Sequence, residues 1–133
     1  MRILVCYSDK PRGVAAIELA QDHAAKWQAE IDVVWAVSRE KALAQKGIQE
    51  FEEELEGHVT QLFESSGIAY KVHLLIHTTS AGDQIVDFAK QIKSDMIVLG
   101  LRKRSLVGKV IFGSNSQNII MNAPCPVLTT RRK

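Results

Sequence analysis

Apolar residues along the chain fall into five short runs that have the length and composition of β-strands. Three runs are almost continuously apolar, which is typical of strands covered on both faces of a sheet. The run at residues 69–77 instead alternates apolar and polar side chains, which indicates a half-exposed strand at a sheet edge. The five expected strands are residues 3–7, 31–37, 69–77, 95–100 and 125–130.

Segments between these strands repeat apolar residues three and four positions apart, the spacing of an amphipathic helix. The first helix begins at Pro11, the second closes at Gly67, and Ser80 is placed to cap the third. A fourth is expected to open in GSNSQNIIMN, residues 113–122, whereas residues 38–47 are expected to form a mobile connection. The apolar stripes are Ile17, Ala20, Ala24 and Trp27, then Ile48, Phe51, Leu55, Val59 and Leu62, then Ile85, Phe88 and Ile92.

The chain therefore alternates strands and helices from end to end, which predicts an α/β fold: a parallel sheet with helices on both faces. Because the chain has 133 residues and no repeat or credible linker, we expect one domain over residues 1–133. The first and fourth strands are the most apolar, so we expect them to be neighbours at the centre of the sheet.

The carboxyl ends of these two central strands carry polar residues. Tyr7, Ser8 and Asp9 follow the first strand, and the basic segment 100–105 follows the fourth. Ligands of doubly wound sheets bind beyond the carboxyl ends of the strands, where the strand order reverses. We therefore expect both segments to flank one crevice.

Part of the basic segment looks like a P-loop, the phosphate-binding loop of many nucleotide-binding proteins. A P-loop that ends at Gly108 and Lys109 requires a glycine at position 103 and a hydroxyl residue at position 110. The chain has Lys103 and Val110 at these positions. The P-loop interpretation is therefore rejected.

A second pattern uses glycines that lie on either side of this segment. Gly100 ends the fourth strand, and Gly113 with Ser114 opens the last helix. A helix N-terminus offers unpaired N–H groups and a positive dipole end to an anion, and Asn115 and Ser116 add amide and hydroxyl groups. A plain helix cap explains the same Gly-Ser pair and stays open as the alternative.

The net charge of +2 hides an uneven distribution, because residues 96–133 contain seven Lys and Arg residues and no Asp or Glu. A solvated basic face and a site for an anionic ligand both account for this bias. Nucleic-acid binding is disfavoured, since no aromatic residue interleaves the basic clusters. With no membrane-length apolar stretch and with Cys6 and Cys125 as expected unpaired thiols, we expect a cytoplasmic protein without membrane insertion.

Three segments of the chain resemble the universal stress protein family. Nucleotide-binding members carry Gly-x2-Gly-x9-Gly-Ser/Thr after the fourth strand, and this chain has Gly100, Lys103, Gly113 and Ser114 at those places. ILVCYSDKPRGVAAIELA is similar to the family's first strand and helix, and APCPVLTT to its last strand. The resemblance covers essentially the whole chain and implies a Rossmann-like, adenine nucleotide alpha hydrolase-like fold with strand order 3-2-1-4-5.

The resemblance also implies an adenine-nucleotide site. Residues after the first two strands would face the adenine, the segment after the fourth strand would border the ribose and phosphates, and the start of the last helix would hold the phosphates. The residues so implied are Ser8, Asp9, Ala36, Val37, Gly100, Arg102, Lys103, Gly113, Ser114 and Asn115.

Two positions depart from the family pattern. Lys103 stands where the family has its second glycine, and its side chain, with those of Arg102 and Arg104, can contact phosphate oxygens from outside the loop. Ser8 stands where the family usually has aspartate, with Asp9 next to it. Ser8 can hydrogen-bond a base or a ribose but brings no charge.

The resemblance implies ATP, or AMP, ADP or cyclic AMP, as the ligand, with Mg²⁺ as an accompanying ion. It also implies a homodimer through the last strand, where an exposed ladder can pair with a second copy; Arg131 and Arg132 at this edge support the alternative of a guarded monomer. The pairing residues would be Val127, Leu128, Thr129 and Thr130.

The predicted function is that of a stress-response protein that binds an adenine nucleotide and acts through its assembly or through contacts with a regulated partner protein. No nucleophile, base and orienting group can be identified together, so no catalytic residue is predicted and slow ATP hydrolysis is the most that we expect. One alternative is an interaction module of the same fold that has lost nucleotide binding. A second is an enzyme of nucleotide-dependent transfer.

His73 and His77 stand four positions apart on the predicted edge strand. A strand rises about 3.3 Å per residue, which puts them about 13 Å apart and too far to share a metal ion. We expect both histidines on a solvated strand face. The cysteines lack CxxC spacing, so neither metal nor redox chemistry is predicted.

Overall fold

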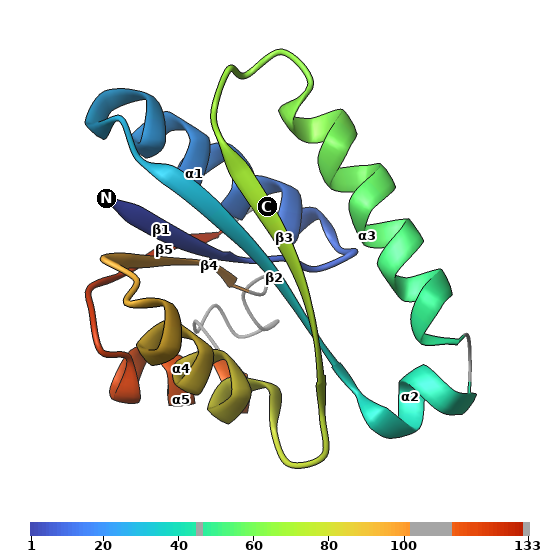
Figure 1. The fold of residues 1–133 in the computed structure, drawn as a ribbon. Helices are drawn as coiled ribbons and strands as arrows, with labels where there is room; N and C mark the ends of the chain where they lie inside the picture. The colour runs from blue at the N-terminus through green and yellow to red at the C-terminus, as the bar shows by residue number, and fades with distance from the viewer. Residues whose placement is uncertain (45–46, 102–112, 132–133) are drawn as a thin grey trace, which may run out of the picture.

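A computed structural model describes residues 1–44, 47–101 and 113–131 of the chain. Its strands form one parallel sheet in the order β3-β2-β1-β4-β5 (Figure 1). The α/β class, the strand order, the central positions of the first and fourth strands and the edge position of the third are thereby confirmed. The strands are β1 (Arg2–Cys6), β2 (Glu30–Ser38), β3 (Tyr70–His77), β4 (Met96–Leu101) and β5 (Val127–Arg131).

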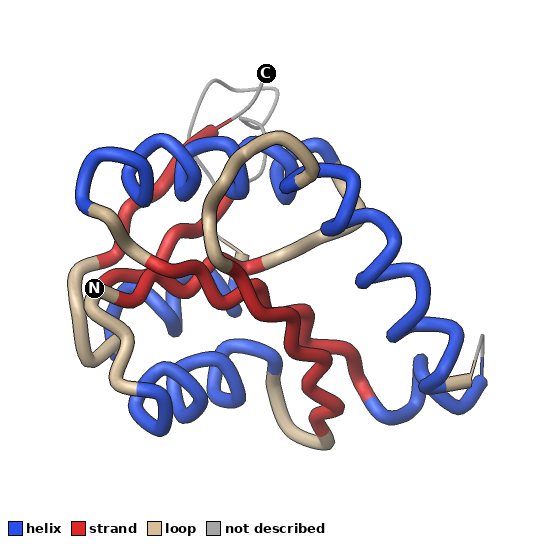
Figure 2. Tube along the Cα trace, turned by 45° about the horizontal axis from the view of Figure 1, so that its top comes forward, coloured by secondary structure: helices blue, strands red, loops and turns tan. Residues whose placement is uncertain are grey.

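Helices cover both faces of the sheet, as Figure 2 shows from a second direction. Side chains alternate along β1, so that Ile3 and Val5 enter one core layer while Leu4 and Cys6 enter the other. The first layer lies under α1 (Pro11–Trp27), α2 (Arg39–Ala44) and α3 (Ile48–Phe63), and the second under α4 (Ala81–Ile92) and α5 (Ser114–Asn122). None of the described helices is long and apolar enough to cross a membrane.

The apolar stripes predicted from the sequence lie mostly in the core, with two exceptions at helix ends. Trp27 is 63% exposed, because α1 ends there and Gln28 turns the chain away in a left-handed conformation (φ 53°). Ile48 is 42% exposed at the first position of α3. At the other end of α3 the side chain that enters the core is Phe63, whereas Leu62 is half-buried.

The predicted mobile connection at residues 38–47 is wrong for most of its length, because α2 occupies Arg39–Ala44. The hydroxyl of Ser38 accepts a hydrogen bond from the backbone N–H of Lys41 at 3.1 Å, and the Ala42 side chain is completely buried. A helix of six residues, fewer than two turns, with one buried alanine is too short to produce a periodic apolar signal. Residues 45 and 46 lie outside the described part of the chain.

The loop after β1, the first turn of α1 and the end of β4 pack backbone against backbone. A Cβ atom at Gly100 would overlap the carbonyl oxygen of Arg12, and one at Gly13 would overlap the carbonyl oxygen of Ser8. Both positions therefore require glycine for packing alone. Gly100 needs no ligand to explain it.

Candidate functional site

A pocket of about 310 Å³ opens beyond the carboxyl ends of the two central strands. From β1 the sheet continues through β2 to β3, and from β4 it continues to β5, so the strand order reverses between β1 and β4. Crevices at such a reversal are the usual ligand sites of doubly wound sheets. The volume of this pocket lies at the small end of the range for small-molecule sites, roughly 300–1,000 Å³.

Five of the residues implied by the sequence line this pocket: Ser8, Asp9, Ala36, Gly100 and Asn115. They come from the ends of β1, β2 and β4 and from the first turn of α5. A crevice is therefore present where the segment after β1 meets Gly100, the first residue of the predicted segment 100–105, whose residues 102–105 lie outside the described part of the chain. A role of these side chains in binding stays a prediction.

The other residues implied by the family resemblance are not among the described lining residues of the pocket. Val37 is only 4% exposed and belongs to the core layer under α1 and α3, away from the described lining of the pocket. Gly113 and Ser114 precede the lining residue Asn115 at the start of α5. Arg102 and Lys103 lie outside the described residues.

The pocket also has lining residues that the sequence did not indicate. Lys10 and Arg12 belong to the turn into α1, Lys41 comes from α2, and Trp35 comes from β2. Lys10 and Arg12 adjoin Ser8 and Asp9 in the sequence, so their proximity could have been inferred. Lys41 could not, because its helix carried no recognisable signal.

Two helix N-termini at this pocket have no side-chain cap. The N-cap residues are Lys10 for α1 and Gly113 for α5, and neither makes a side-chain capping hydrogen bond. Uncapped helix N-termini bind anions through free N–H groups and the helix dipole. At α1 few N–H groups are free, because Pro11 has none and that of Gly13 donates to the Lys10 carbonyl oxygen at 2.9 Å. The lining residues Arg12 and Ser116 lie in the first turns of these two helices.

The N-terminus of α4, in contrast, is already occupied by protein groups. The hydroxyl of Ser80 accepts a hydrogen bond from the N–H of Asp83 at 3.1 Å, which confirms the predicted cap. The amide oxygen of Asn115 accepts a hydrogen bond from the N–H of Gly82 at 2.9 Å. Asn115 thus ties α5 to α4, and its amide nitrogen is the part of the side chain left for a ligand.

A second contact extends this junction between α4 and α5. The Asn118 amide donates to the Asp83 carboxylate at 2.8 Å. That hydrogen bond, and a smaller contribution from Ser80, lower the pKa of Asp83. The two helices whose first turns border the pocket are therefore joined by Asn115 and Asn118.

An aromatic cluster lies beside the pocket on the face of the sheet that α1, α2 and α3 cover. The Tyr7 hydroxyl contacts Nδ1 of His58 at 2.6 Å, and the Tyr7 ring packs edge-on against Trp35 with centroids 5.1 Å apart. Trp35 packs edge-on against Phe51 of α3 in the same way. Burial, followed by the charges of Glu54 and Asp9, raises the pKa of Tyr7 to about 12, so its phenol stays protonated.

Burial likewise raises the pKa of Cys6, another lining residue, to about 12. A protonated thiol is a poor nucleophile and a poor metal ligand. Cys125 is half-buried and unpaired, as predicted, and its pKa is also raised by burial. Among the described residues no group of three or more His, Cys, Asp or Glu side chains is arranged to hold a metal ion.

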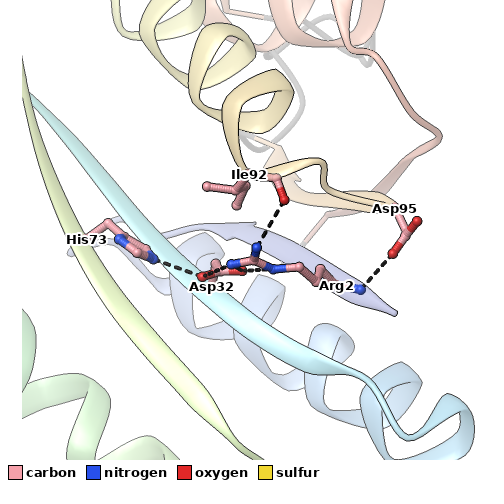
Figure 3. Close-up of polar contacts among 5 residues, drawn as sticks. All are labelled: Arg2, Asp32, His73, Ile92 and Asp95. Atoms are coloured by element: carbon pink, nitrogen blue, oxygen red, sulfur yellow. Dashed lines mark hydrogen bonds and ion pairs between the residues drawn. The ribbon is translucent and has the colours of Figure 1, made fainter.

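His73 does not lie on a solvated strand face, so that expectation is wrong. Its Nε2 donates to the buried carboxylate of Asp32 at 2.9 Å, and its ring packs against Phe88 with centroids 4.8 Å apart (Figure 3). The alternation of β3 was predicted correctly, but α4 covers the polar side of this edge strand. His77 is also partly covered, and its Nδ1 is buried without a hydrogen-bond partner among the described residues.

The same carboxylate binds the guanidinium of Arg2 from the adjacent strand. The Arg2 Nη2 atom donates to Asp32 at 3.1 and 3.2 Å, Nε donates at 3.3 Å, and Nη1 donates to the carbonyl oxygen of Ile92 at 3.1 Å. Figure 3 shows the Arg2–Asp32–His73 cluster running across β1, β2 and β3. The cluster holds these strands and the end of α4 together.

The strand order and the pocket at its reversal define a doubly wound α/β protein with a ligand crevice over the central strands. Residues 1–131 match the sequence model of the universal stress protein family. The chain therefore belongs to the universal stress protein family.

Known members resemble the chain to different extents. A universal stress protein of Methanocaldococcus jannaschii is 31% identical over 74 residues, which make up 56% of this chain and 42% of that protein. This match therefore spans less than half of the archaeal relative. One from Mycolicibacterium smegmatis is 25% identical over 130 residues, 97% of this chain and 96% of that protein.

Solved structures of the family share the fold. A universal stress protein from Archaeoglobus fulgidus superposes with a TM-score of 0.82 at 30% identity, covering 97% of both chains. An Archaeoglobus fulgidus universal stress protein in complex with dAMP gives 0.73 at 23% identity, covering 97% of this chain and 96% of that chain. A universal stress protein in complex with cAMP gives 0.75 at 15% identity, covering 100% and 98%.

Proposed function

We propose that residues 1–133 act as one universal stress protein domain that binds an adenine nucleotide in the pocket over β1 and β4. The observation that carries the proposal is that the uncapped first turn of α5 borders a pocket that is also lined by the cations Lys10, Arg12 and Lys41. Such a pocket is suited to phosphate groups.

The remaining lining suits the base and the sugar. Ile85, Leu99 and Ile119 form an apolar wall on the α4–α5 side of the sheet, and a planar base can pack against such a wall. The hydroxyl of Ser8 and the backbone near Ala36 offer hydrogen-bonding groups beside it. Relatives of the same fold were solved with dAMP and with cAMP, which supports an adenine nucleotide as the ligand.

The finer features of the proposal follow from the family resemblance. The ligand would be ATP, ADP, AMP or cyclic AMP, and Mg²⁺, where a polyphosphate is bound, would be held mainly by phosphates and waters. Asp9 is the one carboxylate among the described lining residues that could support such an ion. The protein would act in the cytoplasm as a homodimer that changes its assembly or a partner contact, with slow ATP hydrolysis at most.

Analysis of nucleotide content and binding tests this proposal directly. The purified protein is heat-denatured, released nucleotides are identified by mass spectrometry, and the apo protein is titrated calorimetrically with ATP, ADP, AMP and cyclic AMP. We expect release or saturable binding of at least one of them. Absence of both at millimolar ligand would sink the proposal.

One observation favours a second candidate, an interaction module of this fold without nucleotide binding. Gly100 is required by the Arg12 backbone, and one oxygen of Asn115 is used by Gly82, so two of the implied site residues have roles in packing. A protein that had lost its ligand would keep both. The same titration separates the two functions.

A further inference from the structure

We infer that the edge strand β3 is an interaction surface for a lysine- or arginine-rich extended segment of a partner protein, which binds by adding a strand to the sheet. The inference concerns the sheet edge opposite β5 and does not depend on the nucleotide pocket. It is carried by an open row of backbone groups that lies between two acidic helices.

The outer edge of β3 presents unpaired backbone groups. The N–H of Ile31 in β2 donates to the carbonyl oxygen of Ala69 at 3.0 Å, so every second residue from Lys71 onward turns its backbone groups toward β2. The other four residues of the strand turn theirs outward, where no described strand or loop pairs with them through its backbone. These four residues are Tyr70, Val72, Leu74 and Ile76.

The strand also lacks the features that usually block an exposed edge. It is 8 residues long, contains no proline and pairs with β2 in unbroken register. Lys71 is its only lysine, arginine, aspartate or glutamate. Every residue of β3 is half-buried or exposed, and no described helix crosses in front of the strand in Figure 1. The other edge strand, β5, has 5 residues and ends at Arg131, so β3 is the longer and less guarded edge.

The two helices beside β3 are both acidic. α3 contains five glutamates and no lysine or arginine, and α4 contains two aspartates and one lysine. Ring contacts join both helices to the strand: Phe63 of α3 stacks on Tyr70 with centroids 4.3 Å apart, and Phe88 of α4 packs against His73. The side chains of an added strand would point alternately to the α3 side and the α4 side, so lysine or arginine on either side meets negative charge.

The same charges disfavour a second copy of this chain as the occupant. Two copies that paired through β3 would be related by a two-fold axis, which brings α3 of one copy beside α3 of the other. Like charges brought together in this way oppose association. A positively charged segment keeps the backbone pairing, which supplies affinity in strand addition, and turns the repulsion into attraction.

NMR titration of the isotope-labelled protein with two synthetic peptides tests the inference. Both peptides have the length of β3, and one alternates lysine with valine while the other alternates glutamate with valine. We expect the lysine peptide to bind about tenfold more tightly, and to slow hydrogen exchange at the outward amides of Val72, Leu74 and Ile76 about tenfold. Equal affinity of the two peptides, or unchanged exchange at these amides, overturns the inference. Protection of the same amides by a second copy, seen without peptide as the protein concentration rises, also overturns it.

A modified peptide and a pair of variants separate strand addition from charge attraction alone. N-methylation of the lysine peptide removes its backbone donors but keeps its charge, and should weaken binding about tenfold. Val72→Pro removes an outward N–H of the protein and should weaken binding to a similar extent. Val72→Ala is the matched control, because it also shortens the side chain but keeps the N–H, and should bind like the wild type. Circular dichroism checks the fold of both variants. Unchanged affinity of the N-methylated peptide for the wild-type protein overturns the inference even where Val72→Pro does not fold.

Discussion

Among the described residues, Asp32 is the only charged residue whose side chain is buried. It binds side chains from two other strands, Arg2 of β1 and His73 of β3. The sequence placed it within a buried strand but did not indicate a partner. Its partners, Arg2 and His73, are 30 and 41 positions away in the sequence, and only the sheet register brings them together. Pairings between distant residues of this kind leave no local pattern that a sequence reading can detect.

Asp32→Ala is predicted to destabilise the protein by about 3 kcal/mol, because it leaves the Arg2 guanidinium partly buried without its carboxylate. The partial exposure of Arg2, 34% of its side chain, keeps the loss at the low end of the range for a broken buried pair. Urea denaturation followed by circular dichroism measures the change. Asp22→Ala, at an exposed helix position without a described ion pair, is the control. Equal stability of the two variants would contradict the role given to the cluster.

Gly113→Val is predicted to abolish nucleotide binding without unfolding the protein. Gly113 has φ −64° and ψ 160°, an extended conformation that valine adopts without strain, so the new side chain adds bulk only where α5 begins. Calorimetry measures binding, and thermal denaturation checks the fold. Gly57→Ala, at a site in α3 where an added Cβ has no neighbour within 4 Å, is the control. Retained binding in Gly113→Val would show that the phosphates do not lie at α5.

At the scale of elements, the sequence predicted the five strands and four of the five helices that the structure describes. The strands and the helices α1, α3 and α4 carry a periodic or continuous apolar signal, and α5 was indicated by the Gly113–Ser114 pair at its start. The errors lie where tertiary contacts decide. The α2 helix is six residues long and depends on a buried alanine and a hydroxyl cap, Ala42 and Ser38. The solvated face assigned to β3 was wrong because the alternation of a strand does not reveal which helix covers its polar side.

Asn118→Ala is predicted to raise the pKa of Asp83 toward its ordinary value, because the amide of Asn118 is the main group that lowers it. A lowered pKa stabilises the fold above the ordinary carboxyl pKa, and this stabilisation is lost as pH falls through the folded-state pKa. The α4–α5 junction of the wild-type protein should therefore loosen in acid. NMR titration of the Asp83 carboxyl carbon measures the shift, with Gln91→Ala, at an exposed position near the end of α4, as the control. An unchanged pKa in Asn118→Ala would contradict this role.

At the scale of the whole molecule, the sequence predicted where the pocket would lie but not all that lines it. The apolar character of β1 and β4 made them central, and the rule for doubly wound sheets placed a crevice at their ends. Trp35 lies within β2 and Lys41 lies in α2, the helix that follows β2, and both residues line this crevice. Gly100, the first glycine of the motif, also has a packing role, because it lets β4 approach the backbone of α1 closely. Motif glycines alone therefore do not establish the ligand.

The last strand gives the prediction for assembly. The Pro126 carbonyl bonds the N–H of Ile97, so strand alternation turns the backbone groups of Leu128 and Thr130 toward β4 and those of Val127 and Thr129 outward. Thr129→Pro removes an outward N–H and leaves the pairing with β4 intact, as edge strands allow. A homodimer that pairs through β5 should therefore become a folded monomer at micromolar concentration, with its assembly measured by sedimentation velocity and its fold checked by circular dichroism. Thr129→Ser keeps the N–H and should stay dimeric. A dimer that survives Thr129→Pro would place the contact elsewhere on the molecule.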